Sequence, residues 1–283
     1  MREKQHELRS LSYYMTIAGA RMEFGGNQME SDILKIENLS FSYHTLNGET
    51  RTLQDLSFSV KKGEFLAIVG PSGCGKSTIL SLIAGLLEPE GGGITFYGAD
   101  GKKPGIGYML QRDHLFEWRT VWQNVTLGLE IQRRMKPESL DRVKKMLEDY
   151  GLSGFASKKP SELSGGMKQR AALIRTMALE PEILLLDEPF SALDYQTRLT
   201  VSADIARIIR NAGKTAVLIT HDLSEAISLS DRVIVLSKRP ATVKGIFPIR
   251  LTLPDDSLLA ARKAPEYSEY FNQIWEELSD ETQ

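Results

Sequence analysis

The sequence lacks the features that identify secreted, membrane-spanning or nucleic-acid-binding proteins. It holds one cysteine, Cys74, in 283 residues, so no disulfide can form within the chain. Its net charge of −2 leaves no basic excess for a nucleic-acid backbone. No uncharged apolar run approaches the roughly 20 residues that a membrane-spanning helix needs. The composition suits a reducing compartment, and any work at a membrane requires a partner that holds the protein there.

The first residues imitate a secretory signal only weakly. A moderately apolar segment, residues 11–20, follows several basic residues, but Glu3 and Glu7 dilute the basic end and hydroxyl side chains interrupt the apolar one. We therefore expect no signal peptide and a disordered extension at the start. The expected organisation is an extension over 1–31, one domain over 32–253, and a tail over 254–283 that contains a short helix.

Two kinds of strand pattern divide the domain. Residues 33–43 and 53–60 alternate apolar and polar side chains, which predicts half-buried antiparallel strands. Short continuous apolar runs predict strands buried on both faces, as in a parallel sheet. These runs lie at 65–69, 183–186, 216–219 and 233–236.

Helical patterns separate the apolar runs. This order predicts an α/β domain whose parallel sheet is wrapped by helices. One segment, about residues 112–162, departs from the alternation and contains an amphipathic helix at 142–150 that Gly151 can terminate. We interpret this segment as a helical insertion in the α/β core.

A phosphate-binding loop follows the first buried run. Its pattern, G-x-x-x-x-G-K-[ST], opens a predicted helix, where backbone N–H groups and the helix dipole attract phosphate. Lys76 supplies a cation for the terminal phosphates, and the Ser77 hydroxyl can ligate Mg²⁺. The predicted ATP-binding residues in this loop are Gly70, Pro71, Ser72, Gly73, Cys74, Gly75, Lys76, Ser77 and Thr78.

Two acidic residues follow the second buried run. We predict that this run lies on a strand neighbouring that of the phosphate loop. Asp187 then lies at the sheet edge, where its carboxylate can hold Mg²⁺ through water. Glu188 is placed to polarise the attacking water as a general base. Seen alone, the pair is also compatible with a solvated strand end.

The run Leu163-Ser-Gly-Gly-Met-Lys-Gln-Arg170 decides the family. It resembles the signature sequence of ABC ATPases, in which Ser164 caps a helix and Gly165 and Gly166 leave the backbone bare. The resemblance covers about residues 34–250. It implies a P-loop NTPase core of the RecA type, an N-terminal antiparallel β subdomain and an inserted helical subdomain. It also implies that the signature contacts ATP bound by a second copy.

Further family motifs occur in order. The resemblance makes Gln111 the Q-loop glutamine in the Mg²⁺ shell, Asp194 the D-loop residue at the dimer interface, and His221 the switch histidine that contacts the γ-phosphate. Tyr43 matches the aromatic that stacks on adenine. Taken singly, His221 is compatible with an ordinary polar residue after a strand, and Tyr43 with a strand aromatic.

Finer features resemble the importers of nitrate, sulfonates and taurine. These are the segment after Gln111, the Met-Lys-Gln-Arg form of the signature, and the run from His221 to Pro240. Met167 stands where most ABC ATPases carry glutamine. A thioether cannot donate a hydrogen bond, so we do not expect Met167 to make the contact across the dimer that the glutamine makes in most family members.

The resemblance implies an ATP-hydrolysing import subunit at the cytoplasmic face of the membrane. Its partners would be a second copy, a membrane permease and, indirectly, an external solute-binding protein, with no nucleic acid. The alternative is a soluble ABC ATPase of the iron–sulfur cluster assembly type. The transported solute is left open, because its site lies on other subunits.

Two side-chain expectations complete the analysis. Cys74 lies among peptide N–H groups and beside Lys76, which favour a reactive thiolate that ATP would shield. Leu115, Phe116 and Trp118 are apolar residues in a polar segment, which predicts a contact surface for the permease. The alternative for Trp118 is packing into the helical insertion.

Overall fold

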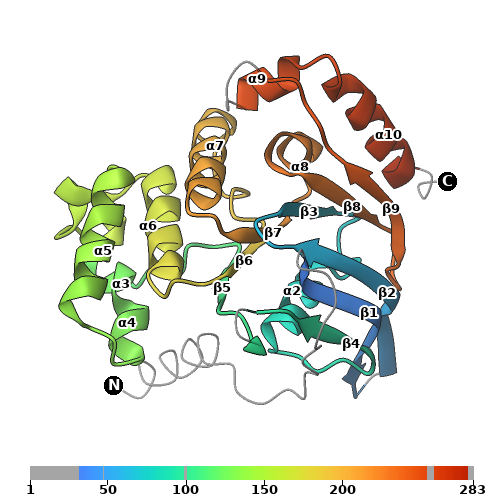
Figure 1. Cartoon of the computed structure of the whole chain (residues 1–283), viewed down its shortest axis with the longest axis horizontal. Helices are drawn as coiled ribbons and strands as arrows, with labels where there is room; N and C mark the ends of the chain where they lie inside the picture. The colour runs from blue at the N-terminus through green and yellow to red at the C-terminus, as the bar shows by residue number, and fades with distance from the viewer. Residues whose placement is uncertain (1–31, 47, 99–100, 254–257, 280–283) are drawn as a thin grey trace.

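The computed structural model describes residues 32–46, 48–98, 101–253 and 258–279. The expected extension over 1–31 lies outside these ranges. Figure 1 shows sheets at the centre of the molecule, a group of helices on one side and the C-terminal helices on another. No helix in the described part of the chain has the length and apolar character needed to cross a bilayer.

The first sheet is antiparallel and has three strands in the order β2-β1-β4. Its strands are β1 (Asp32–Thr45), β2 (Gly48–Lys61) and β4 (Gly91–Phe96). The alternation predicted for β1 and β2 is present, but the strands extend further into a hairpin than the apolar residues indicate. Strand β4 was not predicted, because its sequence Gly91-Gly-Gly-Ile-Thr-Phe96 shows little alternation.

The second sheet has six strands in the order β5-β6-β7-β3-β8-β9. Its first five strands in this order run parallel, and β9 pairs antiparallel with β8. The bounds are β3 (Phe65–Val69), β5 (Ile106–Met109), β6 (Ile183–Asp187), β7 (Thr215–Ile219), β8 (Arg232–Leu236) and β9 (Val243–Pro248). The predicted α/β class with a mostly parallel sheet is confirmed. Strand β9 was not predicted.

The position of β7 corrects one expectation. Strand β7 lies between β3 and β6, so the strand of the phosphate loop does not neighbour the strand of Asp187. The two sites still meet, because parallel strands end at one edge of the sheet and α2 (Lys76–Ala84) begins above that edge.

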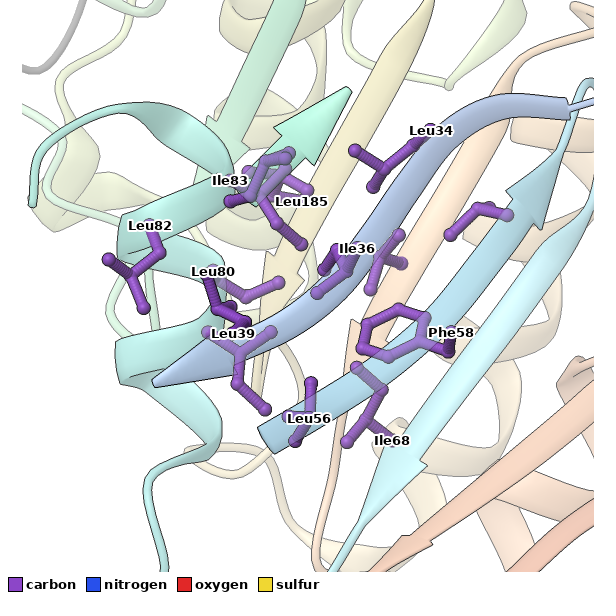
Figure 2. Close-up of a cluster of buried hydrophobic side chains, with 14 of the residues drawn as sticks. Leu34, Ile36, Leu39, Leu56, Phe58, Ile68, Leu80, Leu82, Ile83 and Leu185 are labelled. Carbon is purple, nitrogen blue, oxygen red and sulfur yellow. The ribbon is translucent and has the colours of Figure 1, made fainter. Parts of the chain in front are cut away.

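Helices cover both faces of the parallel sheet. Helix α2 and the antiparallel sheet share one core with β3, β6, β7 and β8, and the side chains of this core meet in Figure 2. Labelled residues of β1 and β2, such as Ile36 and Phe58, face Leu80 of α2 and Leu185 of β6. Helices α6 (Gly165–Met177), α7 (Tyr195–Asn211) and α8 (Leu223–Leu229) cover the opposite face.

The segment interpreted as an insertion contains α3 (Val121–Val125), α4 (Leu127–Ile131) and α5 (Pro137–Asp149). Two 3-10 turns follow, η2 (Ser153–Phe155) and η3 (Pro160–Glu162). Its buried residues form a core of their own that includes Ala171 and Ile174 of α6. The signature helix α6 therefore belongs to the packing of both the helical group and the sheet.

The C-terminal tail contains two helices. Helix α10 (Tyr267–Ser279) agrees with the helix expected in the tail, whereas α9 (Leu258–Lys263) was not predicted. Ile274 of α10 is fully buried against residues of α8, β3 and β8. The tail thus covers apolar side chains of the ATPase core.

Arg232 links the two sheets through a bidentate ion pair and a hydrogen bond to the backbone. Glu64 precedes β3 and accepts from the Nε and Nη2 atoms of Arg232 in β8 at 2.7 and 3.0 Å. The same arginine donates to the backbone oxygen of Ser59 in β2. The two side chains are only 8% and 19% exposed, so neither charge is well solvated when its partner is lost.

We expect Glu64→Ala to lower the free energy of unfolding by roughly 2–4 kcal/mol, because it leaves Arg232 partly buried and unpaired. Urea unfolding of the isolated subunit measures the change. The control is Asp141→Ala, which removes an exposed pair with Lys144 and should cost less than about 0.5 kcal/mol. Equal losses in the two variants would show that the Glu64–Arg232 pair contributes nothing particular.

Candidate functional site

The phosphate loop begins directly after β3 and ends in α2. Gly75 has a φ of 122°, and a Cβ built there would lie 2.8 Å from the Thr52 side chain, so only glycine fits. The Lys76 side chain is buried and folds back over the loop. Its Nζ donates to the backbone oxygens of Gly70 and Pro71 at 2.8 and 3.0 Å. Its ammonium group therefore lies directly over the turn that would hold phosphate.

The expectation of a reactive Cys74 is wrong. The residue is 1% exposed and belongs to the core shared by α2 and the two sheets. A Cβ built on Gly70 would lie 3.1 Å from its sulfur, so the thiol fills space behind the loop. Its backbone N–H belongs to the loop, where it donates to the carbonyl of Pro71.

Oxygen donors meet beneath the start of α2. The Ser77 hydroxyl donates to Oδ1 of Asp187 at 2.9 Å, and the Tyr108 hydroxyl donates to Oδ2 at 3.3 Å. Burial raises the pKa of Asp187 above its ordinary value, against the two hydrogen bonds. A cation beside this carboxylate would favour its charged form.

These donors suit Mg²⁺ better than a transition metal. Hydroxyl and carboxylate oxygens are its preferred ligands, and it keeps waters and substrate phosphates in its shell. Across the described ranges, no group of three or more His, Cys, Asp or Glu residues could hold a metal ion. The fit is therefore to a metal that arrives with a phosphate ligand.

Three side chains converge beside Asp187. Oε2 of Glu188 lies 3.3 Å from Nε2 of Gln111 and 3.1 Å from Nδ1 of His221. Gln111 follows β5, Glu188 follows β6 and His221 follows β7, so three adjacent parallel strands deliver them to one edge. The His221 side chain is 54% exposed and that of Glu188 21%, which leaves the cluster open to a ligand.

Glu188 has an unusual backbone. Its φ is +44°, in the left-handed region that residues other than glycine rarely adopt. Its N–H donates to Ile219 in β7 at 2.9 Å, and its carbonyl accepts from the Ser191 hydroxyl at 3.0 Å. These bonds hold the turn and direct the carboxylate toward Gln111 and His221.

Tyr43 lies near the phosphate loop. Its ring is 42% exposed, packs edge-on against Phe41 at 4.9 Å between centroids, and its hydroxyl lies 3.2 Å from Oγ1 of Thr78. The tyrosine therefore presents an open aromatic face beside the start of α2. This position is compatible with the predicted contact to adenine.

The signature residues form a separate surface. Ser164 caps α6 by accepting from the N–H of Met167 at 3.3 Å, and Asp194 caps α7 by accepting from Thr197 at 3.0 Å. A Cβ on Gly166 would lie 2.8 Å from the Val201 side chain, so α6 and α7 pack closely there. A hollow of about 340 Å³ opens between the two helices. Its lining includes Ser164, Gly166, Met167 and Asp194 but no residue of the phosphate loop.

Two arginines connect these motifs and were missed by the sequence analysis. Arg175 of α6 donates to the backbone oxygens of Asp113 and His114, both at 2.6 Å, and so joins the signature helix to the segment after Gln111. Arg198 of α7 donates to Leu193 at 2.9 Å and lies 3.7 Å from Asp222, which follows His221. Backbone carbonyl partners and an ion pair between residues far apart in the sequence leave no local pattern, so neither link could be predicted.

Comparison with known proteins agrees with this arrangement. The family model described as ABC transporter matches residues 53–191. An uncharacterized ABC transporter ATP-binding protein, YtlC of Bacillus subtilis (strain 168), is 44% identical over 87% of this chain and 95% of its own length. The chain belongs to the ABC transporter ATP-binding proteins. It is an ATP-binding and ATP-hydrolysing subunit.

Other relatives refine the comparison. The taurine import ATP-binding protein TauB of Pelagibacter ubique (strain HTCC1062) is 37% identical over 87% of this ABC protein and 96% of its own length. A dimeric ATP-binding cassette in a post-hydrolysis state with ADP and Pi superimposes with a TM-score of 0.65. It is 31% identical and covers 77% of this chain and 99% of its own. The resemblance to the taurine, nitrate and sulfonate branch is thereby confirmed.

The burial of Cys74 leads to a labelling prediction. We expect maleimide to react with native protein at least about 100-fold more slowly than with urea-unfolded protein, because a thiol that is 1% exposed reacts only after local opening. Mass spectrometry of timed samples measures the rate, and Ser72→Cys supplies an exposed thiol in the same loop as the control. Fast labelling of native protein that MgATP suppresses would show instead that Cys74 is a reactive thiol shielded by the nucleotide.

Proposed function

We propose that two copies of this chain bind two molecules of MgATP between them and energise import of a small solute through a membrane permease. The proposal places the protein at the cytoplasmic face of the membrane, held by that permease and served by an external solute-binding protein. The observation that carries it is the convergence of Gln111, Glu188 and His221 beside the Ser77–Asp187 pair.

Each side chain has a role that its position supports. The phosphate loop and Lys76 hold the phosphates, and Tyr43 stacks on adenine. Ser77, Asp187 and Gln111 are the proposed Mg²⁺ shell, and the bound ion would neutralise charge on the phosphates. Glu188 accepts a proton from the attacking water, while His221 orients that carboxylate and senses the γ-phosphate.

The need for a second copy follows from the separation of two surfaces. The signature hollow contains Ser164, Gly166 and Met167, and none of its lining residues belongs to the phosphate loop or to the Glu188 cluster. A helix N-terminus with bare glycines suits an anionic ligand, yet the same chain brings no phosphate site to it. A second copy facing the first would supply ATP to that surface.

The proposed solute class rests on the relatives. Their names include taurine, nitrate and aliphatic sulfonate import, all small anions or zwitterions. These names support the importer reading and give no support to the iron–sulfur cluster assembly alternative. The residues that select the solute belong to the permease and the solute-binding protein.

We expect Glu188→Gln to keep ATP affinity and to slow hydrolysis by roughly 10²–10⁴-fold, the range for loss of a general base. The unhydrolysed ATP should trap the two-copy state. Gel filtration of the variant with MgATP should therefore show a dimer. Glu138→Gln, an exposed glutamate on α5, is the matched control and should behave as wild type.

A monomer at high protein concentration, with ATP binding confirmed by calorimetry, would contradict the two-copy site. Unchanged hydrolysis in Glu188→Gln would instead remove Glu188 as the base. The two results are independent, so either part of the proposal can fail alone.

Trp118 is the proposed contact with the permease. Leu115 and Phe116 are 7% and 6% exposed, which excludes them as open interface residues and corrects that part of the prediction. The indole of Trp118 is 44% exposed and lies on the Phe116 ring at 4.5 Å between centroids. A fixed, half-exposed aromatic next to the Gln111 segment fits an anchor residue at a protein interface.

We expect Trp118→Ala to weaken co-purification with the permease by about 2 kcal/mol or more in binding free energy. The melting temperature and basal ATP hydrolysis of the isolated subunit should stay nearly unchanged, while transport falls. Trp275→Ala is the matched control, since Trp275 is 57% exposed on α10. Strong destabilisation of the Trp118→Ala subunit, or equal loss of assembly in both variants, would remove the interface assignment.

A further inference from the structure

The turn between β8 and β9 lies against the phosphate loop. A Cβ built on Gly70 would lie 3.0 Å from Cβ of Leu236, at the end of β8. A Cβ built on Gly73, which has a φ of +74°, would lie 3.5 Å from the terminal Nη2 atom of Arg239. The guanidinium of Arg239 is therefore beside the middle of the loop, although more than 160 residues separate the two positions in sequence.

Backbone hydrogen bonds fix this turn in place. Ala241 donates to Thr52 in β2 at 2.8 Å, and its carbonyl accepts from Gln54 at 3.0 Å. Within the turn, Ser237 donates to Thr242 at 3.0 Å. Thr52 also bounds the phosphate loop, since its side chain closes the space over Gly75. One residue of β2 thus braces both the phosphate loop and the turn that carries Arg239.

The donors of Arg239 are not used by protein acceptors. Within residues 32–46, 48–98, 101–253 and 258–279, its exposed guanidinium forms no ion pair and donates no hydrogen bond. Arg232, the first residue of β8, shows the contrast, because it binds both oxygens of Glu64. Lys76 likewise donates to two loop carbonyls. Among the described residues, Arg239 is thus a cation beside this loop whose hydrogen-bonding capacity is still available.

We propose that Arg239 binds the phosphates of the nucleotide held by its own chain. This inference rests on the proposed ATP site and adds a second basic side chain to Lys76. A planar guanidinium presents parallel N–H donors that match two phosphate oxygens, and such charge-assisted bonds are among the stronger ones in proteins. The ligand class is a nucleoside di- or triphosphate. Because the turn is fixed, only the side chain has to move.

The test uses MgADP, which is not hydrolysed and so isolates binding by one copy. Isothermal titration calorimetry on Arg239→Gln should show affinity about tenfold weaker than wild type, the loss of one charge-assisted contact at an exposed site. Wild-type affinity should also fall more steeply with NaCl concentration than that of the variant, because a charged contact is screened. Lys238→Gln removes the same charge one position away and should stay within twofold.

Two results would overturn the inference. One is MgADP affinity of Arg239→Gln within twofold of wild type; the other is an equal loss in Lys238→Gln, which would mean a general charge effect. If Arg239→Gln lowers the melting temperature by several degrees, Arg239→Lys is measured instead and should retain part of the affinity and the salt dependence. The proposed function fails separately, if the Glu188→Gln variant, with Arg239 unchanged, does not form a dimer in MgATP.

Discussion

The arrangement of this protein depends on the burial of three short parallel strands. Strands β3, β6 and β7 have five residues each, and all of them are buried. None of these strands can therefore place a solvated charged group inside the sheet. The polar side chains of the site therefore lie at the residues where the strands end. Because the strands are parallel, those ends share one edge, and the phosphate loop, the two carboxylates and His221 meet there.

The same packing explains why the signature surface is held apart from the phosphate loop. Helix α6 contributes to the core on one face of the sheet and to the core of the helical group. Arg175 ties it to the segment after Gln111, and Arg198 ties the D-loop to the residues after His221. Through these two arginines, a shift of Gln111 or His221 would move the surface that would face a second copy.

Local sequence patterns predicted the parts of the fold that show a simple periodicity and the loop that carries the phosphate-binding motif. The buried strands, the α/β class and the place of α10 agree with the sequence analysis, since apolar runs and helical periodicity are local. Strands β4 and β9 were missed because most of their residues are only partly buried and show no clear period. The orientation of Cys74, the order of β3, β7 and β6, and the position of Arg239 beside Gly73 depend on tertiary packing. No window of sequence contains that information.

The backbone of Glu188 has a consequence for how the enzyme can vary. A left-handed φ costs a residue with a Cβ about 1 kcal/mol, a cost that glycine avoids. Folding stability and catalysis therefore favour different residues at the end of β6. Glycine would relax the turn, whereas glutamate keeps it strained and directs a carboxylate toward Gln111 and His221. Selection for thermal stability alone would favour replacement of the residue that turnover requires. A cassette of this kind that had lost its catalytic duty could drift toward glycine there and become more stable as it became inactive.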